Sequence, residues 1–197
     1  MESRSSAAAW AFRYSPFDRL RPVIRSLREW TLDREQRRRA ATYVAALFIE
    51  PADEDVHWLS EHGTDCDVDH ARWELRYARR ALGLLGAQRD ALDDRTASLV
   101  AAALARELAN DPAVAPGKIR MAERQLNARL SAYGDALMNR AGEGSGWHLG
   151  RALLEFAGHR DAVRPEIVAH AGDLLARYMG EANEALRKSF GVATLPG

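Results

Sequence analysis

Acidic and imidazole side chains crowd into one short stretch of the sequence, GTDCDVDH, at residues 63–70. Asp65, Asp67 and Asp69 alternate as in the opening of a calcium-binding loop, which needs a glycine at its sixth position and a glutamate at its twelfth. A histidine and an arginine stand at those two positions here, and the arginine argues strongly against calcium. Because a strongly helical run follows, we predict that the three aspartates cap a helix and meet the positive end of its dipole.

Histidine and glutamate recur four residues apart on predicted helices, which places both side chains on one helix face. Several such pairs converging in a bundle could hold a metal, but carboxylate-bridged bundles need Glu-x-x-His on two helices, and this sequence lacks that repeat. Surface ion pairs are the simpler interpretation, so no cofactor is expected, and a divalent metal is the alternative. Its ligands would come from His57, Glu61, His62, Asp65, Asp67, Asp69, His70, Glu166, His170 and Asp173.

The sequence contains a candidate nucleophile and a glycine-rich loop, but neither has the neighbouring residues that catalysis or phosphate binding requires. Cys66 lies between two histidines in the sequence, but the flanking aspartates disfavour a thiolate. The loop GEGSGWHLG at residues 142–150 follows a predicted helix instead of a strand, and it lacks the lysine and hydroxyl residue of a phosphate loop. We therefore interpret it as a connection between helices. With no complete catalytic constellation, the balance is against an enzyme.

Charge is balanced overall but unevenly distributed. The chain has 28 basic and 28 acidic residues, so its net charge does not attract nucleic acid or an anionic membrane. Residues 1–43 hold ten arginines and five acidic residues, whereas residues 44–70 hold eight acidic residues and no lysine or arginine. The two regions either stay solvated, fold onto each other, or dock a basic face onto an acidic face of another subunit.

An arginine cluster, Arg34, Arg37, Arg38 and Arg39, could follow a phosphate backbone and makes a small DNA-binding regulator a further alternative. No helix-turn-helix signature follows it, because the acidic segment stands where a basic recognition helix would be. The expected partner is therefore a protein, and nucleic acid is not expected.

Aromatic residues indicate where such a partner would bind. Three of them lie in residues 1–14, which we expect to form an N-terminal arm that packs on the body or on a neighbouring subunit. Aromatic residues are enriched at the cores of protein interfaces, although two tryptophans near the acidic segment could equally fill a second buried helix face. The predicted interaction surface comprises Trp10, Phe12, Tyr14, Arg34, Arg37, Arg38, Trp58 and Trp73.

The elements that must position these residues are all predicted to be helices. Abundant Ala, Leu, Arg and Glu favour helix, and apolar residues recur at three- and four-residue intervals, as in Ala71, Leu75, Ala78 and Leu82. A three-heptad pattern predicts a long helix near the centre of the bundle. The expected helices span about 15–30, 33–49, 53–63, 68–85, 96–109, 117–140, 147–158 and 165–190, with Asp53 or Asp55, Asp93 or Asp94, and Ser145 as N-caps and Gly63 and Gly191 as stops.

These patterns predict an all-α fold, a single multi-helix bundle of about seven or eight helices with no sheet, formed by residues 15–197 after the arm. One cysteine excludes an intrachain disulfide, and the longest apolar runs are too short to span a membrane, so we expect a cytoplasmic protein. The function expected is that of a non-catalytic helical interaction or assembly protein that forms a homo-oligomer. A metal-dependent helical-bundle enzyme, either a hydrolase or an oxygen-using protein, is the first alternative.

Overall fold

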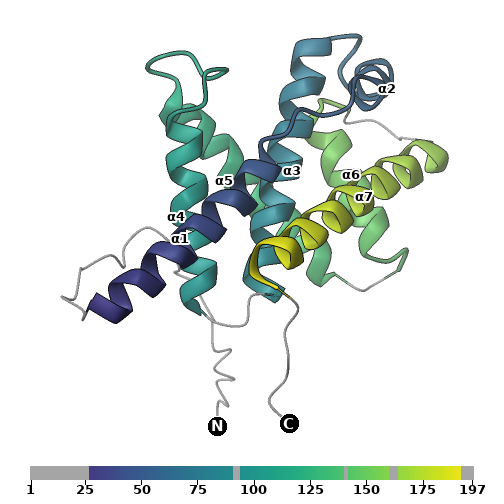
Figure 1. The fold of residues 1–197 in the computed structure, drawn as a ribbon. Coiled ribbons are helices and arrows are strands. Elements are labelled where there is room, and N and C mark those ends of the chain that lie inside the picture. Colours follow the sequence, from purple (N-terminus) through teal and green to yellow (C-terminus); the bar gives the residue numbers. More distant parts are fainter. Residues whose placement is uncertain (1–26, 91–93, 140–141, 160–163, 192–197) are drawn as a thin grey trace, which may run out of the picture.

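The chain was analysed as a computed structural model that describes residues 27–90, 94–139, 142–159 and 164–191, with side chains from Asp33 onward. Seven helices and no strand occur in these ranges, which confirms the all-α bundle (Figure 1). Trp10, Phe12 and Tyr14 lie outside the described residues. The helices are α1 (Leu27–Leu47), α2 (Asp53–Gly63), α3 (Val68–Asp90), α4 (Asp94–Ala109), α5 (Ile119–Met138), α6 (Ser145–Phe156) and α7 (Pro165–Phe190).

Helix α3 occupies the centre of the bundle and contacts each of the other six helices. Its predicted apolar stripe is buried from Ala71 to Leu82, while Val68 at its start is exposed. The heptad-patterned helix that was predicted near the centre is α5, which packs directly against α3 and also contacts α4 and α6. A heptad pattern sets the angle at which a helix packs but does not determine how many neighbours surround it.

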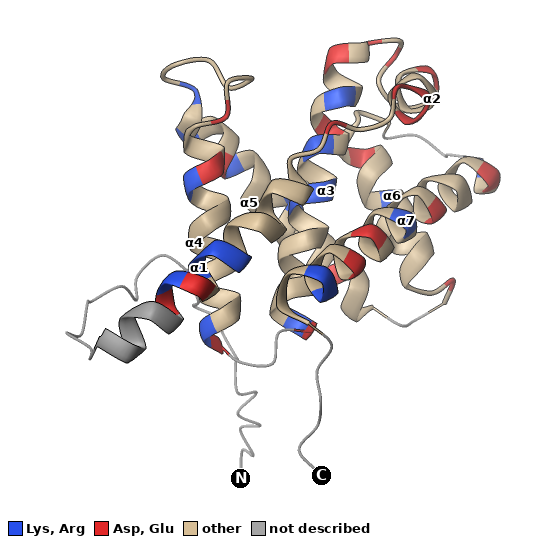
Figure 2. Ribbon diagram, viewed as in Figure 1, with Lys and Arg blue, Asp and Glu red and all other residues tan. Residues whose placement is uncertain are grey.

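Charged side chains of α3 tie this central helix to its surroundings. Five of them lie between residues 72 and 80, and each forms an ion pair with a different part of the chain (Figure 2). Three acidic residues around α2, Glu50, Asp53 and Asp55, thus pair with arginines of α3 and α7, whereas Arg38 and Arg39 of the α1 cluster pair with Glu35 of their own helix. The pairs of α3 are Arg72–Asp53, Glu74–Arg129, Arg76–Glu50, Arg79–Glu181 and Arg80–Asp111.

Helices α6 and α7 pack closely because glycine stands where they cross. A Cβ atom on Gly150 would lie 2.2 Å from the carbonyl oxygen of Val168, and one on Gly172 would lie 2.5 Å from that of Gly146. Since real Cβ atoms do not approach carbonyl oxygens so closely, larger residues would force the two helices apart. This crossing fixes α6 against the C-terminal helix.

Several predicted helix ends are wrong. Helix α1 continues through Thr31 and Asp33, where a new helix was expected, because residues that favour caps are also tolerated inside a helix. Neither Asp53 nor Asp55 caps α2, since the N-cap position is Ala52 and makes no side-chain bond. Similarly, Gly144 precedes α6 at a φ of 86°, so Ser145 is the first helical residue and not the cap.

The C-terminal end of α2 differs by one residue from its prediction, whereas both ends of α7 agree with theirs. Helix α2 includes Gly63 as its last residue, and Thr64 takes the C-cap position. In α7 the prediction is confirmed at both ends: Pro165 begins the helix, and Gly191, at a φ of 86°, donates its backbone N–H to the carbonyl oxygen of Arg187. No helix within the described ranges is long and apolar enough to cross a bilayer.

Candidate functional site

The acidic stretch before α3 forms a helix cap. The carboxylate of Asp67 accepts a hydrogen bond of 2.9 Å from the backbone N–H of His70, which is the N-cap geometry, so the capping prediction is confirmed for Asp67. Asp65 and Cys66 adopt left-handed conformations, with φ of 50° and 67°, in the turn before the helix. Asp69 lies in the first turn, where its charge meets the helix dipole.

The remaining predicted metal ligands are spread over several surfaces. His57 pairs with Glu61 at 3.1 Å on the exposed face of α2, and His70 approaches Glu74 at 3.4 Å. Asp173 and Glu166 are exposed on α7. Among the residues that the structure describes, no three His, Cys, Asp or Glu side chains come together in a way that could hold a metal ion.

The two regions that carry these residues are nevertheless neighbours, and Trp58 lies between them. Its ring stacks on His62, with centroids 5.3 Å apart, and lies against His170 of α7 at 4.2 Å. Trp73 is half-buried and packs against Tyr77. Both tryptophans of the predicted interaction surface thus use part of their rings to pack against the core of their own chain.

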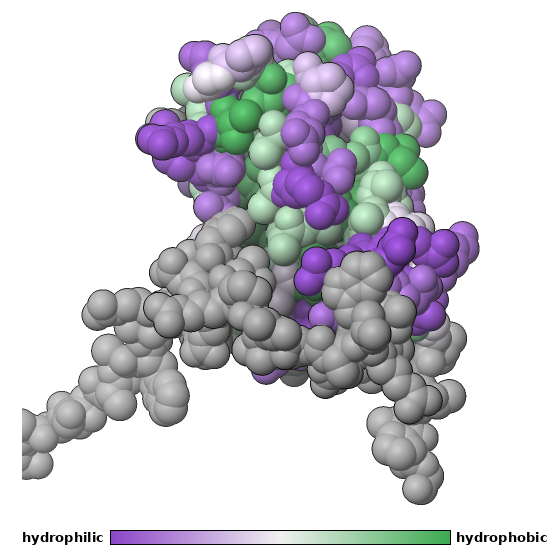
Figure 3. Space-filling view, turned by 60° about the vertical axis from the view of Figure 1, so that its left-hand side comes forward, coloured by the Kyte–Doolittle hydropathy of each residue, from purple (hydrophilic) through white to green (hydrophobic). Residues whose placement is uncertain are grey.

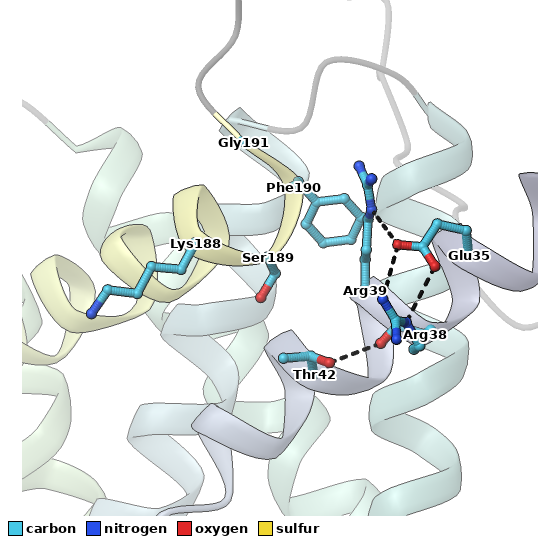
Figure 4. A pocket seen from close by; sticks show the side chains of 8 residues that line it. All are labelled: Glu35, Arg38, Arg39, Thr42, Lys188, Ser189, Phe190 and Gly191. Carbon is cyan, nitrogen blue, oxygen red and sulfur yellow. Dashed lines mark hydrogen bonds and ion pairs between the residues drawn. The ribbon is translucent and has the colours of Figure 1, made fainter.

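A polar hollow of about 560 Å³ lies between α1 and the C-terminal end of α7 (Figure 4). Arg34, Arg37 and Arg38 of the predicted interaction surface are exposed on α1, and Arg38 lines this hollow with Arg39. Glu35 accepts hydrogen bonds from both Arg39 and Arg38, and these bonds lower the pKa of the Glu35 carboxyl. An incoming anion would have to displace that carboxylate, so this geometry does not favour DNA binding through these arginines, which stays an alternative.

A larger and mostly apolar groove of about 1100 Å³ lies between α3, α5, α6 and α7. Gly142 and Gly144, at φ of 66° and 86°, turn the chain between α5 and α6, which brings the start of α6 beside the end of α5. The lining residues are Leu85, Gly86, Gln88 and Arg89 of α3; Gly134, Leu137 and Met138 of α5; Ser145, Gly146 and Leu149 of α6; and Ala176, Met179, Gly180 and Asn183 of α7.

Glycines of the groove wall differ from those at the crossing of α6 and α7. A Cβ atom on Gly180 would meet nothing within 4 Å, and one on Gly134 would meet only Leu85, at an ordinary contact distance of 3.7 Å. Both lie inside helices, where glycine costs roughly 0.5–1 kcal/mol relative to alanine. Packing within the chain therefore does not explain them, whereas an occupant that approaches the helix backbones closely would.

The charge and exposure of the groove fit an apolar occupant. The groove has one charged lining residue, Arg89, which donates two hydrogen bonds of 2.8 Å to the carboxylate of Asp90. These hydrogen bonds lower the pKa of the Asp90 carboxyl. Met138 leaves 83% of its surface exposed, the highest value among the large apolar side chains of the described residues. The groove thus offers glycine backbone, methyl groups and thioethers, with no unpaired charge at its wall.

Apolar residues are also visible on the side of the molecule where α1 and α4 come forward (Figure 3). Much of the exposed apolar surface of these two helices is alanine, as at Ala45 and Ala102. Alanine side chains bury little area when they bind a partner, and area is the main source of hydrophobic stabilisation. We therefore take the groove as the candidate binding site.

The chain matches no protein-family model, and no curated protein or solved structure is significantly similar to it.

Sequence reasoning did not find the groove, although a signal for it was present. Gly86, Gly134 and Gly180 interrupt segments whose apolar periodicity is otherwise that of a helix. An isolated glycine inside a helical pattern costs about 1 kcal/mol relative to alanine, so it calls for a packing or functional reason. Their convergence on one groove depends on which helices are neighbours, and that information is not contained in the spacing of any single helix.

Proposed function

We propose that this protein is a non-catalytic helical interaction protein that associates with itself, and that the groove between α3, α5, α6 and α7 is its binding site. The observation that carries this proposal is the apolar groove, whose wall includes helical glycines without a packing role in the chain. Apolar surface that stays exposed in a water-soluble fold favours burial against a partner. The zero net charge supports self-association, because it leaves little long-range repulsion between copies.

The pattern of ion pairs supports an interaction role as well. The buried charges of α3 are used to join helices of the same chain, as in Glu74–Arg129 and Arg80–Asp111. Charges used in this way fix the geometry of a scaffold. The groove is lined by residues of the rigid helices of that scaffold, which reduces the conformational entropy lost when a partner binds.

Filling the groove tests this proposal. Gly180 lines the groove, and a Cβ atom there meets nothing within 4 Å, so Gly180→Leu adds bulk to the groove wall. The matched control is Ala128→Leu, which places a leucine at an exposed site on α5 outside the groove. Light scattering at tens of micromolar should give a dimer for the parent and the control, and a monomer for Gly180→Leu. A monomeric parent would contradict the proposal, as would equal dimerisation of all three.

A further inference from the structure

We infer that the aromatic segment Trp10–Tyr14 of one copy occupies the groove of a second copy. The inference rests on the self-association proposed above and names the part of the partner that binds. Residues 1–26 lie outside the described residues, and they join the bundle at the start of α1. The segment is therefore a part of this chain that precedes the first described helix.

The chemistry of the groove fits aromatic rings. Met138 and Met179 line it, and methionine sulfur makes favourable contacts with aromatic edges. Flat rings also pack well on helix backbone that carries no side chain, which Gly134 and Gly180 provide. The polar lining residues Ser145, Gln88 and Asn183 can bond the indole N–H and the phenol O–H, because tryptophan and tyrosine usually find such partners when they are buried.

The spacing of the aromatic residues fits a groove that is open on one side. Trp10, Phe12 and Tyr14 occupy alternate positions, so in an extended segment their side chains point to the same side. The intervening residues, Ala11 and Arg13, then point away from the groove toward solvent. The only charge of the segment, on Arg13, thus remains hydrated.

The length of the connection and the area available are compatible with exchange between two copies. Residues 15–26 span about 18 Å as the predicted helix, at about 1.5 Å per residue, and up to about 40 Å when fully extended, at about 3.3 Å per residue. Three aromatic side chains bury about 150–250 Å² each. Two segments exchanged in a symmetric pair, together with the groove surfaces that they cover, therefore bury well over the roughly 1,200 Å² of a stable interface. A segment buries the same area in its own groove as in the groove of a second copy, so the assignment to a second copy rests on the self-association proposed above.

The first test alters the segment in the full chain. The triple variant Trp10→Ser, Phe12→Ser, Tyr14→Ser is compared with Ala7→Ser, Ala8→Ser, Ala9→Ser, which changes three neighbouring residues of the same arm. We expect the aromatic variant to raise the dimer dissociation constant by about tenfold or more, as loss of aromatic hot spots does, while the control matches the parent. If the aromatic variant dimerises as the parent does while Gly180→Leu is monomeric, this inference is wrong and the proposed function stands. A monomeric parent overturns both.

A second test identifies the source of the segment. Ala11→Cys and Gln88→Cys are combined in a Cys66→Ser background, and a short bismaleimide cross-linker is added to a mixture of isotopically heavy and light chains. Cross-linked peptides that join heavy to light chains are expected for exchange between copies. Cross-links confined to pairs of the same isotope would show that each chain occupies its own groove, and would overturn the assignment to a second copy.

Discussion

The carboxylate of Glu74 on α3 meets the guanidinium of Arg129 on α5 through two hydrogen bonds inside the bundle. The Arg129 Nε atom lies 3.0 Å from Oε2 of Glu74, and Nη2 lies 2.5 Å from Oε1. The side chains are only 4% and 6% exposed. Arg129 also lies 4.1 Å over the ring of Phe156 on α6, so this one side chain joins three helices.

Removing one partner of this pair should be costly. Arg129→Met removes the guanidinium that pairs with the buried Glu74 carboxylate and leaves only the His70 imidazole, 3.4 Å away, beside it. Breaking a buried pair in this way typically costs about 3–5 kcal/mol in the free energy of unfolding. The double variant Glu74→Leu, Arg129→Met should lose much less than the sum of the two single changes, because neither charge remains. Urea unfolding of the four proteins gives the coupling energy. Additive effects, or a loss below about 1 kcal/mol for Arg129→Met, would contradict the assigned role.

Two helical glycines should respond to alanine in opposite directions. Gly180→Ala fills open space and removes the entropic cost of a helical glycine, so it should stabilise the fold by about 0.4–1 kcal/mol. Gly150→Ala places a Cβ atom 2.2 Å from the Val168 carbonyl oxygen and should destabilise it by about 1–3 kcal/mol or more. Thermal unfolding of both variants checks the contrast. Equal shifts of the same sign would mean that the α6–α7 crossing is not as close as described.

Buried tyrosines should make the fold sensitive to alkali. Burial raises the pKa of the Tyr43, Tyr133 and Tyr178 hydroxyls, with smaller contributions from Asp90, Glu74 and Asp55 respectively. In the unfolded chain these groups ionise near pH 10. Their contribution to stability is therefore complete below about pH 10 and declines above it, because the unfolded chain then releases protons that the fold retains.

Phenolate absorbance measured during an alkaline titration checks this expectation, since these tyrosines should ionise together with unfolding. Tyr133→Phe is the matched variant, because the Tyr133 hydroxyl is fully buried and has no hydrogen-bond partner among the described residues. It should be close to neutral in stability at neutral pH and should shift unfolding to higher pH. Ionisation of all tyrosines near pH 10 with the fold intact would contradict the burial of these groups.

Local patterns predicted the helices well where a cap and an apolar stripe agreed. Pro165, Gly191 and the apolar residues between them place α7 correctly. Asp67 likewise caps α3 as its residue type and position indicate. In these segments the residues that determine a helix end lie within a few positions of that end, so the sequence alone is sufficient to predict it.

Long-range pairings could not be predicted in this way. Asp55 was expected to cap α2, but it is buried and accepts hydrogen bonds from Arg177 and Tyr178 of α7, more than a hundred residues further along the chain. From the sequence alone, Glu74 and Arg129 would likewise be taken for solvent-exposed residues, because their burial depends on which helices pack together. The groove has the same origin, because it exists only where ends of α3, α5 and α6 meet the middle of α7.

The most direct test of the groove as the site of self-association is the NMR signal of the methionine methyl groups during dilution. Met138 and Met179 line the groove, whereas Met121, 45% exposed on α5, lies outside it and serves as the internal control. Dilution from tens of micromolar to below one micromolar should shift the Met138 and Met179 signals as the dimer dissociates, and should leave the Met121 signal unchanged. Two results would contradict the account. The Met138 and Met179 signals could stay constant although the dimer dissociates, or they could stay constant while the Met121 signal shifts.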